Sequence, residues 1–195
     1  MAESDQQAEG EGKGVGQGTL LSIVCSVRNE ADVLAELIQR VDAALSGQSL
    51  DYELIFVNDD SDDGSLDLLI AERAKNPRIK IINMSRCFGF AECLKAGLAN
   101  ASGDAVISMD VDLQDPPELL PELLDKWRDG AEVVYTVRER REGEPAFRML
   151  VTKIAYIIIN RFSRVDLPVE AGDFRLMSKR AVKEFLRLGE MIPYS

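Results

Sequence analysis

The 195-residue sequence contains no histidine. A Ser-His-Asp triad, a Cys-His dyad and a histidine-ligated zinc site are therefore all excluded. The three cysteines, Cys25, Cys87 and Cys93, lack the spacing of a metal site, and each lies in or beside an apolar stretch. We therefore expect three buried free thiols in a reducing compartment.

Long apolar runs and an excess of positive charge are also absent. The longest uncharged apolar stretch near the C-terminus, IAYIIIN at 154–160, is far shorter than the roughly 20 residues that a membrane span requires. The N-terminus lacks the apolar core of a signal peptide. A net charge of −11 argues against wholesale binding to a phosphate backbone, so nucleic acid is not an expected partner.

The pattern of the chain changes at residue 20. Residues 1–19 have almost nothing to bury and predict a disordered tail. From there to residue 195 we expect one α/β domain, because Val/Ile-rich runs alternate with helical patterns, as in a mostly parallel sheet with helices on both faces. The expected strands cover about 19–27, 52–58, 78–84, 104–110 and 131–137. The expected helices cover about 30–45, 65–75 and 89–101, and a stretch after Pro117 to about 128.

Acidic residues follow two of these strands. Asp59 comes after the second strand, and Asp110 and Asp112 end the fourth. Alternate side chains of an extended chain point the same way, so the last two carboxylates are expected about 6–7 Å apart, with Gln114 in phase. Ligands bind beyond the carboxyl ends of parallel strands, and oxygen ligands suit Mg²⁺ or Mn²⁺ with positions left for phosphate. Solvated loop carboxylates are the alternative interpretation.

Residues 138–164 carry the opposite charge to the whole chain, with seven Arg or Lys against three Glu. Arg148 and Thr152 are four residues apart, so they share one face of a helix, as a phosphate anchor requires. The same segment is amphipathic. Two other interpretations stay open: a basic helix at an anionic membrane surface, and a core helix with a solvated basic edge.

Five blocks of the sequence resemble family 2 glycosyltransferases of the GT-A fold, with the closest similarity to the polyprenyl-phosphate glycosyltransferases (the dolichol-phosphate mannose synthase and bactoprenol glucosyltransferase group). The blocks are SVRNEADVLAELI, FVNDDSDDGSLDLL, SRCFGFAECLKAGLANASGDAVISMDVDLQDPPE, VVYTVRERREGEPAFR and AGDFRLMSKRAV. The resemblance implies a catalytic domain that uses Mg²⁺ or Mn²⁺ to transfer a sugar from a UDP- or GDP-sugar to a polyprenyl phosphate. It also implies a cytoplasmic protein, peripheral at the cytoplasmic face of the membrane.

The resemblance assigns the donor-side residues by position. The residues that would contact the nucleotide-sugar are Ser26, Arg28, Glu30, Val57, Asp59, Asp110, Val111 and Asp112. The residues that would hold the metal are Asp110, Asp112 and Gln114.

It also assigns the reaction side of the site. Arg148 and Thr152 would bind the acceptor phosphate, and the catalytic residues would be Asp173, Asp112 and Arg138. A lipid phosphate is already anionic and hardly needs a general base. The difficult charge is that on the departing nucleotide diphosphate, which a metal and neighbouring arginines stabilise.

The chain departs from the family pattern at several positions. Arg28 replaces an aromatic residue, and Cys87 replaces an expected Asn. Asn58 and Asp60 replace the Asp and Gly of a tight turn, where Gly is favoured for positive φ. Related enzymes usually continue past LRLGE through more of the catalytic domain, so the resemblance implies that this chain, which stops at Ser195, is a fragment, a truncated gene product or a soluble paralogue.

Two further interpretations of function belong to other classes. The first is a degenerate GT-A domain that binds a nucleotide-sugar or a protein partner without catalysis, which the turn substitutions favour. The second is a phosphoacceptor signalling domain, because acidic strand ends also bind Mg²⁺ there. The second is disfavoured because the last predicted strand leads into Arg138 rather than into a lysine.

Overall fold

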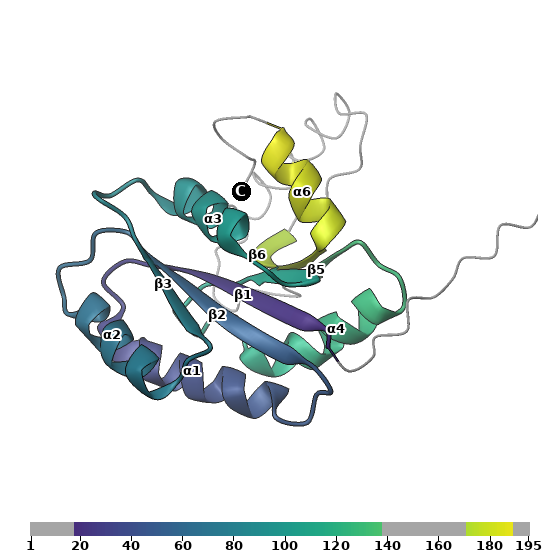
Figure 1. Cartoon of the computed structure of the whole chain (residues 1–195), viewed down its shortest axis with the longest axis horizontal. Coiled ribbons are helices and arrows are strands. Elements are labelled where there is room, and N and C mark those ends of the chain that lie inside the picture. Colours follow the sequence, from purple (N-terminus) through teal and green to yellow (C-terminus); the bar gives the residue numbers. More distant parts are fainter. Residues whose placement is uncertain (1–17, 138–170, 189–195) are drawn as a thin grey trace, which may run out of the picture.

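The computed structural model describes residues 18–137 and 171–188. In these ranges a six-stranded sheet has the order β3-β2-β1-β4-β6-β5 (Figure 1). Its strands are β1 (Leu20–Val27), β2 (Asp51–Asn58), β3 (Ile79–Asn83), β4 (Ala105–Ser108), β5 (Val133–Val137) and β6 (Ala171–Ser178). The helices are α1 (Ala31–Leu45), α2 (Ser65–Lys75), α3 (Phe90–Asn100), the short 3₁₀ turn η1 (Pro117–Leu119), α4 (Leu120–Arg128) and α6 (Lys179–Arg187).

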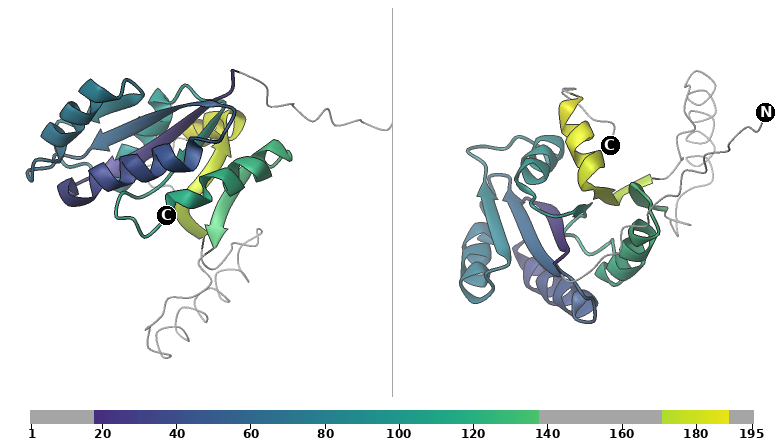
Figure 2. Two further views of the ribbon diagram at one scale, coloured as in Figure 1. Left: turned by 90° about the horizontal axis from the view of Figure 1, so that it is seen from below. Right: turned by 45° about the vertical axis from the view of Figure 1, so that its right-hand side comes forward.

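Helices cover both faces of the sheet. The core on one face includes side chains of α1, α2 and α4, and the core on the other face includes side chains of α3 and α6 (Figure 1). Figure 2 shows α1 and α4 along the same side of the sheet, with β5 beside α4. Each helix buries one apolar stripe, as Leu34, Ile38 and Val41 do in α1. The predicted mostly parallel α/β fold is confirmed.

Strands β1, β2, β3 and β4 pair in parallel. Strand β6, which the sequence interpretation missed, runs antiparallel between β4 and β5. The alternation of apolar and charged residues in β6 was a usable signal, because Phe174 and Leu176 are fully buried while Asp173 and Arg175 are partly exposed. Helix α6, also missed, begins where the Ser178 hydroxyl accepts a hydrogen bond from the Ala181 amide.

Several predictions fall at or beyond the limits of the described chain. The carbonyl of Thr19 accepts a hydrogen bond from the Asp51 amide, so sheet pairing starts just ahead of Leu20. The rest of the predicted tail, residues 1–17, lies outside the described residues, as do Arg138, Arg148 and Thr152. Among the helices of 18–137 and 171–188, none has the length and apolar character that crossing a bilayer demands.

The cysteine prediction needs one correction. All three thiols are free, and Cys25 and Cys93 are buried as expected. Cys87 is exposed, because it lies in the loop between β3 and α3 rather than in either element.

Candidate active site

The carboxyl ends of β1, β2 and β4 meet at one edge because these strands are parallel neighbours. We call this the carboxyl edge and define it as residues 26–30, 58–65, 84–90 and 109–116. Most of the sequence-predicted donor residues lie there, and β6 brings Asp173 to the same end of β4. The structure therefore gathers the described candidate residues into one region.

The loops after β1 and β2 are joined by reciprocal hydrogen bonds. The Asn29 amide donates to Ser61 Oγ at 3.1 Å, and the Asn29 side-chain oxygen accepts from the Asp62 amide at 2.9 Å. Arg28 Nη1 donates to the carbonyl of Asp59 at 2.8 Å. Asn29 and Asp60 both have positive φ, at 58° and 57°. The positive φ expected at Asp60 is confirmed, and the two loops form a single ordered surface.

The first turn of α1 is capped from the second loop. The Glu30 amide donates to Ser65 Oγ, and the Ala31 amide donates to Asp63 Oδ2, both at 3.0 Å. Hydrogen bonds from the Ser65 hydroxyl and from the amides of Ala31 and Ser65 hold the pKa of the Asp63 carboxyl below its ordinary value. The Glu30 side chain makes no capping hydrogen bond. Its carboxylate is thus not used to cap the helix.

Asp59 is 2% exposed, and its carboxylate serves the fold. It accepts hydrogen bonds from the amides of Phe88 at 2.7 Å and Gly89 at 2.9 Å, and from Cys87 Sγ at 3.4 Å. Burial alone would raise the pKa of Asp59, but these hydrogen bonds hold it below its ordinary value. The predicted nucleotide-contacting residue therefore ties the end of β2 to the start of α3.

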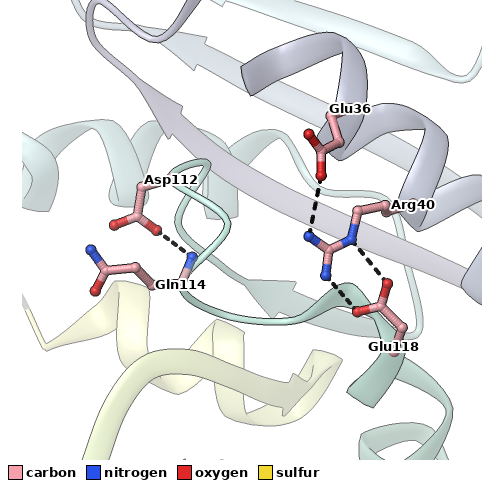
Figure 3. A network of polar contacts seen from close by, with 5 residues as sticks. All are labelled: Glu36, Arg40, Asp112, Gln114 and Glu118. Atoms are coloured by element: carbon pink, nitrogen blue, oxygen red, sulfur yellow. Dashed lines mark hydrogen bonds and ion pairs between the residues drawn. The ribbon is translucent and has the colours of Figure 1, made fainter. Parts of the chain in front are cut away.

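The chain after β4 bends rather than continuing as a strand. Strand β4 ends at Ser108, Leu113 has a φ of 61°, and the Gln114 amide donates to Asp112 Oδ1 at 3.0 Å (Figure 3). The extended arrangement predicted through Gln114 is wrong, because an Asx turn reverses the chain between Asp112 and Gln114. Asp110 is partly exposed and Asp112 is exposed.

The far end of this acidic loop is fixed to α1. Arg40 Nε and Nη2 donate to the two carboxylate oxygens of Glu118 at 2.9 and 2.8 Å, and Glu36 lies 3.6 Å from the same guanidinium (Figure 3). The Arg40 guanidinium holds the pKa of Glu118 below its ordinary value. This bidentate pair and the buried Pro117 anchor the loop that carries Asp112.

The field at the carboxyl edge is negative. Burial, then Asp112 and then Asp63 raise the pKa of Glu30. Burial, followed by the charge of Asp110, raises the pKa of the Cys25 thiol. Hydrogen bonds lower the pKa values of Asp59 and Asp63, whereas burial and the neighbouring carboxylates raise that of Glu30. A bound cation would relieve this repulsion.

The donor set fits a hard divalent ion. Carboxylate oxygens are the ligands that Mg²⁺ and Mn²⁺ prefer, and Mg²⁺ commonly takes one or two carboxylates together with substrate phosphates and water. In residues 18–137 and 171–188, no group of three or more His, Cys, Asp or Glu side chains could hold a metal ion. The chain's own contribution there would therefore be a pair such as Asp110 and Asp112, with phosphate oxygens completing the coordination.

Asp173 reaches the carboxyl edge from β6. The antiparallel β4–β6 ladder ends with Ser108 opposite Arg175, so the chain that continues to Asp110 and the stretch of β6 that holds Asp173 lie at the same end of the ladder. The Ser108 hydroxyl donates to the Asp173 carbonyl at 2.8 Å. Asp173 therefore lies at the end of β4 that carries Asp110, a neighbour that the sequence resemblance alone did not give.

The remaining residues that were predicted to contact the nucleotide-sugar differ in how exposed they are. Val57 is 0% exposed and Val111 is 4% exposed, so only their main chains are available to a ligand. Arg28 is exposed, and Ser26 at the end of β1 is partly exposed. Burial raises the pKa of the Cys93 thiol to about 11, and Ser26 opposes this rise.

Sequence reasoning missed a hydrogen-bonded pair of side-chain amides beside these residues, of which Asn58 is buried and Asn83 is exposed. Asn58 Nδ2 donates to Asn83 Oδ1 at 2.7 Å, where β2 and β3 end side by side. Asn58 is 1% exposed, and its Oδ1 has no hydrogen-bond partner within the described part of the chain. An Asn at the end of each of two neighbouring strands was the available signal.

A parallel sheet with an inserted antiparallel strand, helices on both faces and acidic strand ends is the architecture of GT-A glycosyltransferases. The model of the glycosyl transferase family 2 matches residues 22–186, and the chain belongs to that family.

Three known proteins illustrate the similarity. The "Uncharacterized glycosyltransferase sll0501" of Synechocystis sp. is 44% identical over 170 residues, which are 87% of this chain and 54% of that protein. The bactoprenol glucosyl transferase of Shigella phage SfV is 34% identical over 87% of this chain and 55% of its own length. This chain thus spans about half the length of these curated relatives.

The third protein supports the fold. It is the mannosyltransferase PcManGT from Pyrobaculum calidifontis, whose structure is in complex with GDP-Man and Mn²⁺. The match has a TM-score of 0.62 and 18% identity, and it covers 87% of this chain and 46% of that one.

Proposed function

We propose that this domain binds a nucleotide-sugar and a divalent cation at the carboxyl edge and transfers the hexose to a polyprenyl phosphate. The observation that carries the proposal is that three acidic residues, Asp110 and Asp112 after β4 and Asp173 on β6, lie at the same end of the sheet. The bactoprenol glucosyl transferase relative supports the acceptor class. The mannosyltransferase bound to GDP-Man and Mn²⁺ supports the donor class and the cation.

The described residues divide the donor's contacts among them. The joined loops after β1 and β2, with Arg28, Glu30 and the main chain at Val57, would hold the base and ribose. Asp110 and Asp112 would hold Mg²⁺ or Mn²⁺, which would offset the negative charge that grows on the departing nucleotide diphosphate. Gln114 would support this site through the turn that it forms with Asp112.

The acceptor side of the proposal includes residues outside the described chain. Arg148 and Thr152 would bind the acceptor phosphate, with Arg138 near the reaction centre. Asp173 would face that centre, where an anionic lipid phosphate needs little help from a base. A polyprenyl acceptor would place the domain at the cytoplasmic face of a membrane.

Two measurements test the proposal. The first is a thermal-shift panel of UDP- and GDP-sugars with and without Mn²⁺, which would also choose the base. The second is transfer of radiolabelled sugar to polyprenyl phosphate. Asp112→Ala should abolish the metal-dependent shift and the transfer, whereas Asp129→Ala, a change at an exposed residue after α4, should leave both unchanged.

The outcomes separate the candidate functions. Unchanged metal-dependent nucleotide binding in Asp112→Ala would overturn the assignment of the cation site. A metal-dependent shift without any transfer would favour a domain that binds the donor without catalysis.

A further inference from the structure

Strand β6 is irregular where it reaches the carboxyl edge. Tyr135 pairs with Arg175, but the next pair is Val137 with Ala171. Three residues of β6 therefore lie opposite a single residue of β5, and Asp173 is the middle one of the three. Irregularities of this kind bend a strand and re-aim a side chain, and they are frequent beside active sites.

Side-chain hydroxyls from the neighbouring strands support the irregular stretch. Ser108 Oγ on β4 donates to the Asp173 carbonyl at 2.8 Å, and Thr136 Oγ1 on β5 donates to the Phe174 carbonyl at 3.1 Å. Ser108 is 2% exposed and Phe174 is fully buried. The backbone that carries Asp173 is thus held from both sides, so its side chain has a defined starting direction.

Arg175 then fixes the carboxylate itself. It lies two residues after Asp173, so the two side chains share a face of β6. Arg175 Nη2 lies 3.2 Å from Asp173 Oδ1, with the two side chains 24% and 33% exposed. The Nε of Arg175 is buried and has no hydrogen-bond partner among the described residues. A buried donor left without an acceptor costs free energy.

We propose that Arg175 is a positioning residue that orients the Asp173 carboxylate for sugar transfer. This inference rests on the proposed function, in which Asp173 faces the reaction centre. With Arg175 removed, the Asp173 carboxylate loses its guanidinium partner and can rotate. A displacement of about 1 Å at a reacting group can lower the rate on the order of 100-fold. The nucleotide-sugar would still bind, because the groups proposed to hold it belong to other parts of the sheet edge.

The test compares Arg175→Met, Arg175→Lys, Asp173→Asn and the double variant Asp173→Asn/Arg175→Met in labelled-sugar transfer. Arg180→Met is the matched control, because Arg180 also pairs at 3.2 Å, with Glu132, but is 76% exposed. We expect Arg175→Met to lower kcat about 10- to 100-fold with little change in KM for the donor, and Arg175→Lys to recover part of the loss. The double variant should be no slower than Asp173→Asn, and Arg180→Met should match the wild type.

Three results would overturn the inference. One is a lowered Tm with wild-type kcat in Arg175→Met, which would make the pair merely structural. Another is an additive loss in the double variant, since two residues that act as a unit are not additive. The last is a wild-type kcat in Asp173→Asn. If Asp112→Ala still abolishes transfer in that case, the proposed donor site stands and only the role of Asp173 and Arg175 fails.

Discussion

Replacing Asp59 by Asn separates a structural role of this residue from direct contact with the nucleotide. The wild-type carboxylate is 2% exposed and accepts hydrogen bonds from two backbone amides and a thiol. An Asn side chain has only one accepting oxygen. Its NH₂ group would take the place of the other carboxylate oxygen and would face a hydrogen-bond donor. Hydrogen bonds to a charged group contribute about 1.5–3 kcal/mol each, and one is lost while a repulsive contact is added. We expect a loss of about 3 kcal/mol of unfolding free energy.

The assay is thermal and urea-induced unfolding, with Asp60→Asn as the control. A loss of about 3 kcal/mol corresponds to a Tm lower by roughly 6–12 °C for a domain of this size. Asp60 is exposed at a φ of 57°, which Asn tolerates, so the control should stay within about 0.5 kcal/mol of the wild type. An Asp59→Asn protein that melts within a degree of the wild type would refute the reasoning.

The same variant has a defined pH dependence. The pKa of Asp59 is lowered in the folded state, so its contribution to stability is complete above its unfolded pKa and is lost as pH falls through its folded pKa. The stability gap between wild type and Asp59→Asn should therefore be constant near neutral pH and should close below about pH 4. A gap that persists undiminished in acid would show that lost packing, not the charge, causes it.

Three other substitutions test the packing and the field. Gly97→Ala should destabilise by about 1–3 kcal/mol in urea unfolding, because its Cβ would lie 2.2 Å from Val24 Cγ1; a neutral effect would contradict this close packing. Glu53→Gln should destabilise the fold by about 1–3 kcal/mol near neutral pH. Burial would raise the pKa of Glu53, but hydrogen bonds from neighbouring groups keep this pKa below its ordinary value. The destabilisation should vanish in acid, which a series of Tm measurements against pH would show. Glu30→Gln should raise Tm by a few degrees near neutral pH, because the raised pKa of Glu30 shows that its negative charge is unfavourable in the folded state. This gain in Tm should shrink as pH falls towards the unfolded pKa of Glu30. An unchanged Tm would contradict the repulsion from Asp112.

The sequence predicted the parallel half of the sheet because each of its strands is a short, nearly continuous apolar run. Strand β6 escaped that pattern. Its Asp173 and Arg175 face away from the Phe174 and Leu176 core, and its partners β4 and β5 precede it by many residues. A half-polar strand inserted between two earlier strands gives no alternation of strand and helix along the chain. Pairing across the fold sets its place in the sheet, and the alternation of polar and apolar residues within the strand was the one local signal of it.

Topology also predicted which residues would gather at the carboxyl edge, but not what their side chains do there. The parallel order of β1, β2 and β4 brings Asp59 and Asp110 to one end of the sheet whatever the loops do. Whether a carboxylate meets a backbone amide depends on loop conformation, as the positive φ of Leu113 and the approach of Phe88 to Asp59 illustrate. Those are local choices that the spacing of acidic residues does not encode.

The carboxylates of the edge consequently fall into two groups. Asp59 and Asp63 are saturated by donors of the protein, and their pKa values are lowered, so they hold loops together. The pKa of Glu30 is raised by burial and by neighbouring carboxylates, Asp112 first. A fold gains nothing from carboxylates that repel one another. A bound cation would relieve such repulsion, which supports our proposal that a cation and a nucleotide diphosphate bind beside Asp110 and Asp112 rather than beside Asp59.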